Sequence, residues 1–213
     1  MRLRIGFSKS GSLRYVGHID LQTIWERTAR RAGLPLAYTH GFHPGPRIQI
    51  AAALPLGFSG RAEIVDLWLD SPVDLAALPA ALQTAAPPGL GVSSVQEVDE
   101  RGPALQTQVD FADYEVTLLD AVDQAALAER VAGLLGAATL PRERRDKPYD
   151  LRPLIESLVL QPVEGSGTWR LSMRLAARAG ATGRPEEVLD ALGVPIEAAR
   201  VARTRLILKT DIE

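Results

Sequence analysis

The sequence predicts an α+β protein made of two tandem ferredoxin-like (βαββαβ) units. Three observations support this class. Short stretches alternate apolar and polar residues, and other stretches repeat apolar residues with a helical period. The order strand, helix, strand, strand, helix, strand occurs in the second half and also in the first, where the meander has one extra strand. We expect the first unit at residues 1–100 and the second at residues 110–213, on either side of a connection near residues 99–109. The duplication rests on element order.

In the first half, strands are predicted where apolar residues alternate and helices where they recur every three to four positions. Residues 41–46 (GFHPGP) are expected to form a loop, because two prolines and two glycines leave no regular hydrogen-bonded ladder. The expected strands are Arg2–Ser8, Leu34–Thr39, Arg47–Leu54, Ala62–Asp70 and Leu90–Val98, and the expected helices are His18–Ala32 and Val73–Ala86.

The second half repeats this pattern. A Gly-Ser-Gly turn at residues 165–167 joins two of its strands into a hairpin. A helix is expected to align Leu127, Val131 and Leu134 on one face, and another to start at Pro185 and end before Gly193. The expected strands are Asp113–Leu119, Leu151–Leu160, Thr168–Ala176 and Val201–Lys209, and the expected helices are Gln124–Leu135 and Pro185–Leu192.

The composition is that of an ordinary soluble globular protein, with 46% hydrophobic and 23% charged residues. The absence of cysteine excludes disulfides, thiolate metal sites and an iron–sulfur cluster held by the chain itself. No apolar run approaches the roughly 18 residues that span a bilayer, and the first residues lack the apolar core of a signal peptide. We therefore expect a cytoplasmic protein with no membrane partner.

Charge is distributed unevenly along the chain. Residues 1–50 contain eight Lys or Arg against two Asp or Glu, a balance of +6, whereas residues 51–100 contain one against seven, a balance of −6. The formal net charge of −2 conceals this difference. A basic stretch that also holds all three histidines predicts a site for an anionic ligand, most simply a phosphate backbone.

Two basic groups in this stretch are candidate phosphate contacts. Arg27, Arg30 and Arg31 lie on the polar face of the first predicted helix. Alternatively, they form a solvated face whose cations favour the helix C-terminus. Lys9 and Arg14 flank a small polar turn that can present backbone N–H groups to an anion, or that is a plain connection.

The histidines form a second set of candidates. His18 begins the first helix close to Asp20, and the rigid Pro/Gly loop carries His40, Phe42, His43 and Arg47. Prolines hold such a loop in place at little entropic cost on binding. The histidine spacing matches no known ligand pattern, so no metal is expected. Two histidines, His18 and His43, are also a possible acid–base pair for cleaving RNA or transferring phosphate.

A basic run in the second half is either an exposed loop or a second basic wall beside the first site. Tyr149 follows this run and is available for stacking on a base. The tryptophans at positions 25, 68 and 169 lie in regular elements and are assigned to the core. The basic run comprises Arg142, Arg144, Arg145 and Lys147, and Asp150 and Arg152 follow Tyr149.

The motifs of the chain resemble those of the bacterial radical-SAM-linked protein family, a domain of unknown function. The residues that carry this resemblance are Phe7–Tyr15, His18 with Asp20, Arg30–Pro35, Gly41–Ile48, Lys147 to Pro153, and Arg203 with Leu206. The resemblance implies a partner, because members are encoded beside, or fused to, a radical-SAM protein with a cobalamin-binding-like region. Some members lie near or are joined to ribonuclease E/G-type proteins. Since this chain has no cysteine, the partner would perform any radical chemistry.

The residues predict a non-catalytic accessory protein that binds RNA, and the resemblance implies that it works with a radical-SAM partner enzyme in RNA modification or processing. No cofactor is expected, and the oligomeric state is left open. The alternatives are an RNA-cleaving or phosphotransfer enzyme that uses His18 and His43, and a protein-interaction adaptor without nucleic acid. The expected RNA contacts are Lys9, Arg14, His18, Arg27, Arg30, Arg31, His40, Phe42, His43, Arg47, Lys147 and Arg152.

Overall fold

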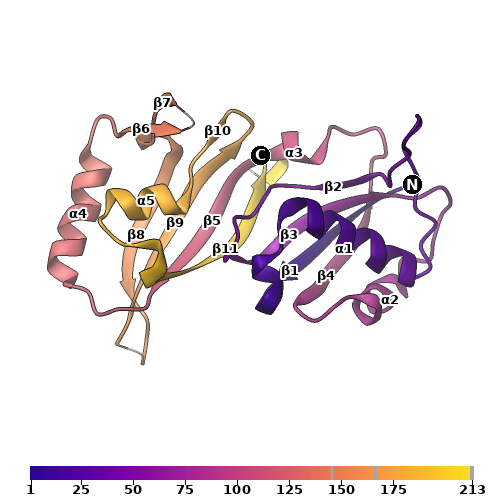
Figure 1. Cartoon of the computed structure of the whole chain (residues 1–213), viewed down its shortest axis with the longest axis horizontal. Coiled ribbons are helices and arrows are strands. Elements are labelled where there is room, and N and C mark those ends of the chain that lie inside the picture. Colours follow the sequence, from indigo (N-terminus) through magenta and orange to yellow (C-terminus); the bar gives the residue numbers. More distant parts are fainter. Residues whose placement is uncertain (145, 166, 212–213) are drawn as a thin grey trace. The chain divides into compact units, whose positions relative to one another are not determined.

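A computed structural model describes residues 1–144, 146–165 and 167–211 of the chain. Its contacts divide the chain into two compact units, Met1–Val109 and Asp110–Ile212. Each unit combines helices with an antiparallel sheet, which confirms the predicted α+β class (Figure 1). No helix in the described ranges is long and apolar enough to cross a membrane.

The first unit has a sheet with the strand order β4-β1-β3-β2, in which every neighbouring pair is antiparallel. The α1 and α2 helices cover one face of this sheet (Figure 1). The elements of the unit are β1 (Arg2–Lys9), η1 (Gly11–Tyr15), α1 (His18–Arg31), β2 (Ile48–Ile50), β3 (Ser59–Trp68), α2 (Leu78–Ala85), β4 (Leu90–Val98) and α3 (Leu105–Gln108).

The core of the first unit lies between the sheet and its two helices. Leu3, Ile5 and Phe7 alternate along β1 and are completely buried, as their spacing predicts. The ring of Phe7 meets the buried Trp25 of α1 edge to face, with the ring centroids 5.1 Å apart. Such packing ties α1 to the middle of the sheet, and it confirms the core assignment of Trp25.

The predicted strand Leu34–Thr39 is wrong. This segment forms two isolated bridges, Leu36 with Leu69 and Tyr38 with Pro46. Pro35 and Pro46 have no N–H to donate, so a continuous ladder cannot form on either side of the bridges. The segment is instead held by single bonds, such as that from the Ala37 N–H to the Trp68 carbonyl at 2.8 Å.

The second helix of the first unit starts later than predicted, at Leu78 instead of Val73. The side chain of Asp74 accepts the N–H of Ala76 at 2.9 Å, which stabilises a turn in place of a helix. Pro79 then takes a first-turn position, where its missing N–H costs nothing.

The second unit has a sheet with the strand order β10-β9-β5-β11, and β8 also pairs with β9. Its elements include a hairpin, β6 with β7, that the sequence did not predict. They are β5 (Val109–Leu118), α4 (Gln124–Gly136), β6 (Pro141–Arg144), β7 (Lys147–Asp150), η2 (Arg152–Leu154), β8 (Ile155–Pro162), β9 (Trp169–Arg178), β10 (Ala181–Thr182), α5 (Pro185–Ala191), η3 (Ile196–Ala198), β11 (Ala199–Leu208) and η4 (Lys209–Asp211).

The predicted face of α4 is buried, because Leu127, Val131 and Leu134 all point into the core. The side chain of Asp123 caps this helix by accepting the N–H of Ala126 at 3.1 Å. The predicted β8–β9 hairpin is present as an antiparallel pair. Ser166, at the centre of its predicted turn, lies outside the described residues.

Candidate functional site

A short loop in the first unit, Thr39–Gly45 (the 39–45 loop), projects three of the predicted site residues into solvent. Its stem is closed by two hydrogen bonds, from Thr39 N–H to the Gly45 carbonyl at 2.8 Å and from Gly45 N–H to the Thr39 hydroxyl at 3.0 Å. Gly41 has a φ of +136°, a conformation that favours glycine. Beyond it, the ring of Phe42 is fully exposed, with a relative exposure of 101%, and His40 and His43 are exposed beside it.

The stem of the loop contacts the C-terminal end of α1. The Arg30 guanidinium donates to the Tyr38 hydroxyl at 2.5 Å and forms an ion pair with Glu26 at 2.9 Å. These contacts, led by the hydrogen bond to Tyr38, raise the pKa of Arg30 above its ordinary value, so the group stays cationic. Loop and helix end therefore form one positively charged, aromatic surface.

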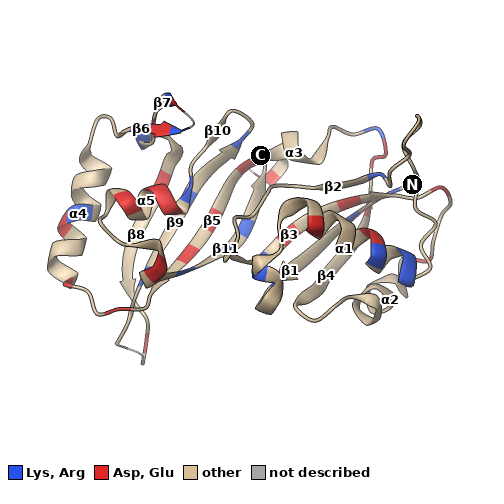
Figure 2. Cartoon of the chain, in the orientation of Figure 1, with Lys and Arg blue, Asp and Glu red and all other residues tan. Residues whose placement is uncertain are grey.

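Three further arginines are exposed on the elements that form this surface. Arg27 and Arg31 are exposed on the last two turns of α1 (Figure 2). Arg47 follows the loop directly and is also exposed, with its guanidinium carbon 4.8 Å from the ring centroid of Trp68. The stacking on Trp68 fixes the direction of Arg47 while leaving its N–H groups for a ligand. We call the 39–45 loop, Arg27, Arg30, Arg31 and Arg47 the loop–helix surface.

The structure does not bring His18 to the loop–helix surface. His18 is the first residue of α1, whereas Arg30, which contacts the loop stem, lies twelve positions later. At 1.5 Å per residue these positions are about 18 Å apart along the helix axis. The structure therefore gives no support to an acid–base pair of His18 and His43.

Arg14 also lies away from the loop, in η1. Its side chain donates to the Gly11 carbonyl at 3.3 Å, and its backbone carbonyl accepts the N–H of Gly57 at 2.9 Å. Tyr15, Ile19 and Leu56 near this turn are exposed by 67%, 78% and 63%. Sequence reasoning did not single out these three exposed side chains.

The expectation that Lys9 contacts phosphate requires correction. Lys9 has an exposed fraction of 1%, and its ammonium group donates to the carbonyl of Val16 at 2.8 Å. A buried ammonium fixed in this way stabilises the turn between β1 and α1 and does not face a surface ligand. Lys9 continues the alternation of Leu3, Ile5 and Phe7, which places it on the buried face of β1. The turn that covers its ammonium group could not be predicted from the sequence.

The basic run of the second unit is mostly a hairpin with paired charges. The Arg144 guanidinium binds Glu187 through two N–H groups, at 3.0 and 2.6 Å, and Arg142 lies 3.7 Å from Asp190. Lys147 is exposed at the start of β7, whereas Arg145 lies outside the described residues.

Arg152 has a structural role that removes it from the predicted RNA contacts. Its guanidinium donates to the carbonyl of Leu135 at 2.9 and 3.1 Å and to that of Ile155 at 3.1 Å. A cation that binds a carbonyl in the last turn of α4 stabilises the end of that helix. The Leu135 carbonyl lies 17 residues away in the sequence, so the position of Arg152 after a basic run suggested a surface role instead.

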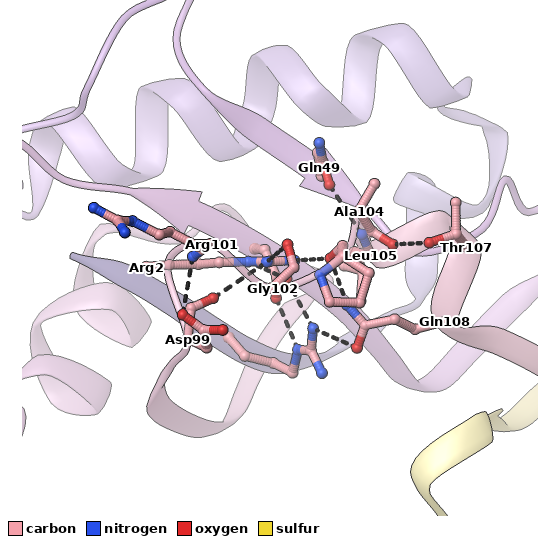
Figure 3. A network of polar contacts seen from close by, with 12 residues as sticks. Arg2, Gln49, Asp99, Arg101, Gly102, Ala104, Leu105, Thr107 and Gln108 are labelled. Carbon is pink, nitrogen blue, oxygen red and sulfur yellow. Dashed lines mark hydrogen bonds and ion pairs between the residues drawn. The ribbon is translucent and has the colours of Figure 1, made fainter.

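Sequence reasoning also missed a buried ionic network on the face of β1 opposite the core. Asp66 is completely buried and accepts from Arg2 at 2.7 Å and from Arg4 at 2.9 Å. Arg2 also donates to the carbonyls of Gly102 and Pro103, both at 3.0 Å, which holds the segment after β4 against the sheet (Figure 3). The sequence feature that could have indicated this network is the alternation of Arg2 and Arg4 with the apolar residues Leu3 and Ile5.

Among the described residues, no three histidine or carboxylate side chains are grouped to hold a metal ion. The groups that the loop–helix surface presents to a ligand are therefore cations, imidazoles and one exposed aromatic ring. This combination suits a ligand with phosphates and planar bases.

The fold and this surface define an α+β protein with an exposed basic and aromatic loop. The chain belongs to a bacterial family described as "Uncharacterized protein conserved in bacteria (DUF2344)", whose model matches residues 2–185. A comparison with curated proteins found no match.

Among solved structures, the chain is similar to one from "Crystal Structure of a Cbf5-Nop10-Gar1 Complex", with a TM-score of 0.52 and 11% identity over 96% of this chain and 48% of the other. It is also similar to one from "Crystal structure of the archaeal box H/ACA sRNP Nop10-Cbf5 complex", with a TM-score of 0.47 and 11% identity over 96% and 47%. The chain thus spans about half the length of these structures. At such low identity, the likeness to the first concerns the fold alone.

Proposed function

We propose that this chain is a non-catalytic accessory protein that binds RNA through the loop–helix surface. The observation that carries the proposal is Phe42, an aromatic ring that is fully exposed at the tip of a loop closed by two hydrogen bonds. Exposing an apolar ring in water is unfavourable, whereas stacking it on a base is favourable and tolerates any sequence.

The charges around Phe42 support the same ligand. Arg30 contacts the stem of the loop, Arg27 and Arg31 lie on the same last turns of α1, and Arg47 directly follows the loop. Arginine N–H groups suit phosphate oxygens, and a basic surface with aromatic side chains is typical of proteins that bind single-stranded nucleic acid. His40 and His43 add ring edges that donate or accept hydrogen bonds.

The wider proposal follows from the resemblance of the motifs. The chain would be a cytoplasmic protein that works with a radical-SAM partner enzyme in RNA modification or processing, and the partner would supply the radical chemistry. The fold proposed with it is a tandem of two ferredoxin-like units. The strand orders β4-β1-β3-β2 and β11-β5-β9-β8 support this arrangement, with β6, β7 and β10 as additions to the second unit.

Neutralising Arg27 and Arg31 together (Arg27→Gln, Arg31→Gln) tests the RNA surface. We expect weaker binding of a labelled single-stranded RNA and a salt dependence reduced in slope by about 1.4, because each lost phosphate contact removes about 0.7. Fluorescence anisotropy at several salt concentrations measures both quantities.

Arg130→Gln is the matched control, since Arg130 is an exposed helical arginine in α4 of the other unit. It should leave both affinity and slope unchanged. An unchanged slope in the Arg27/Arg31 double variant, or an equal loss in the control, would place the RNA elsewhere and overturn the proposal.

A further inference from the structure

A pocket of about 440 Å³ lies in the second unit and is lined by none of the residues of the loop–helix surface. The β6–β7 hairpin supplies one side, and the turn after β9 with the residue before α5 supplies another. Its walls combine cations with apolar groups, and a volume of this size is in the range of small-molecule sites. Its lining includes Arg144, Lys147, Pro148, Tyr149, Leu154 and Arg184.

One wall of this pocket is fixed by paired charges. The two N–H groups of Arg144 that bind Glu187 neutralise that carboxylate, and further bonds from Arg144 to the Thr182 carbonyl at 3.2 and 3.3 Å anchor the hairpin to β10. The Tyr149 hydroxyl also donates to Glu187. The ring of Tyr149 is thereby held in one orientation, with the Arg144 guanidinium carbon 4.8 Å from its centroid.

The environment keeps the phenol neutral. Burial, helped by the hydrogen bond to Glu187, raises the pKa of Tyr149 to about 12. The hydrogen bond to Glu187 also raises the pKa of Arg144. Near neutral pH, Tyr149 therefore stays neutral and Arg144 stays cationic. The wall presents an ordered aromatic ring, and its charges need no additional counter-ion.

Two other cations at the pocket are not neutralised in this way. Lys147 is exposed at the start of β7. Arg184 is 44% exposed, and Glu186 lies 3.9 Å from it, at the limit of an ion pair. Exposed pairs of this kind contribute little. Lys147 and Arg184, from two different sides of the pocket, thus give it a positive potential that a bound anion would satisfy.

We propose that this pocket binds a mononucleotide, with its phosphate between Lys147 and Arg184 and its base against the apolar surface of Pro148, Tyr149 and Leu154. A phosphate group would accept hydrogen bonds from the two cations, and a planar base would stack on the ordered ring of Tyr149. The inference is separate from RNA binding at the loop–helix surface, because it uses residues of the other unit.

Calorimetric titration of the full chain with adenosine 5′-monophosphate and, separately, with inorganic phosphate tests this inference. We expect the nucleotide to bind more tightly than phosphate, because only the nucleotide contacts the apolar wall. The double variant Lys147→Gln, Arg184→Gln should weaken nucleotide binding at least tenfold, whereas Arg130→Gln should bind it as the unaltered chain does.

Three results would overturn the inference: no binding of the nucleotide, equal binding in the double variant, or affinity for inorganic phosphate equal to that for the nucleotide. Displacement of the nucleotide by a short RNA that itself depends on Lys147 and Arg184 would assign the pocket to RNA phosphates instead. The Arg27/Arg31 variant separates the two proposals, since it should lose RNA affinity and keep nucleotide affinity.

Discussion

Replacing Asp66 with asparagine should lower the free energy of unfolding by about 3–5 kcal/mol, because it leaves the buried Arg2 guanidinium without its counter-charge. Arg2 has an exposed fraction of 1% and Asp66 of 0%, so water cannot compensate for the lost carboxylate. Arg4 keeps at most one of its two bonds to the same side chain, because asparagine has a single acceptor oxygen. Urea unfolding followed by tryptophan fluorescence measures the change, since Trp25 and Trp68 lie in this unit.

The matched control is Glu26→Gln, which also removes a carboxylate paired with arginine in the first unit. The Arg30–Glu26 pair is exposed by 59% and 26%, and we expect its loss to cost less than about 1 kcal/mol. Equal effects of the two substitutions would show that the Asp66 network does not hold the unit together.

The same substitution should loosen the segment that follows β4. Arg2 binds the carbonyls of Gly102 and Pro103, and the Leu105 N–H donates to the Gln49 side chain at 3.0 Å (Figure 3). With Arg2 displaced, we expect faster proteolysis within residues 99–108, because this segment would lose the bonds from the Arg2 guanidinium to its carbonyls.

Replacing Phe42 with alanine should weaken RNA binding by about 5- to 150-fold, the loss that corresponds to the roughly 1–3 kcal/mol of one stacked base. The slope of affinity against salt concentration should stay the same, because no charge is removed. Protein stability should also be unaffected, since the ring is fully exposed and buries no area on folding. Anisotropy titrations with single-stranded RNA measure the affinity.

Phe42→Trp is the conservative counterpart and should retain or improve binding, because a larger ring still stacks on a base. Tyr15→Ala is a second control, since Tyr15 is 67% exposed in η1 but lies outside the loop–helix surface. Normal RNA binding by the Phe42→Ala variant would contradict a stacking role for Phe42. An equal loss of RNA affinity in Tyr15→Ala would also contradict it.

Much of the fold could be predicted from local patterns. Leu3, Ile5 and Phe7 alternate with polar residues, and Leu127, Val131 and Leu134 recur with a helical period, so the buried faces of β1 and α4 are visible in the sequence. The errors have physical causes that lie outside such patterns. Prolines at positions 35 and 46 reduce a predicted strand to single bridges, and the side chain of Asp74 delays a helix.

The candidate site could be predicted only in part. The basic and aromatic character of the 39–45 loop could be recognised from its residues. Its contact with α1 could not, because that contact depends on the bond between Arg30 and Tyr38. The sequence could not distinguish exposed cations from structural ones. Lys9 and Arg152 are held by backbone carbonyls that become neighbours only after folding.

The position of bound RNA on the chain is the most direct measurement of the central claim. RNA that carries 4-thiouridine can be crosslinked by irradiation, and the adducts can be located by mass spectrometry of a tryptic digest. Cleavage after Arg31 and Arg47 releases the 39–45 loop in one peptide, Ala32–Arg47. RNA binding at the loop–helix surface predicts that this peptide carries the principal adduct and that Phe42→Ala reduces it. Adducts confined to peptides of the second unit would contradict it.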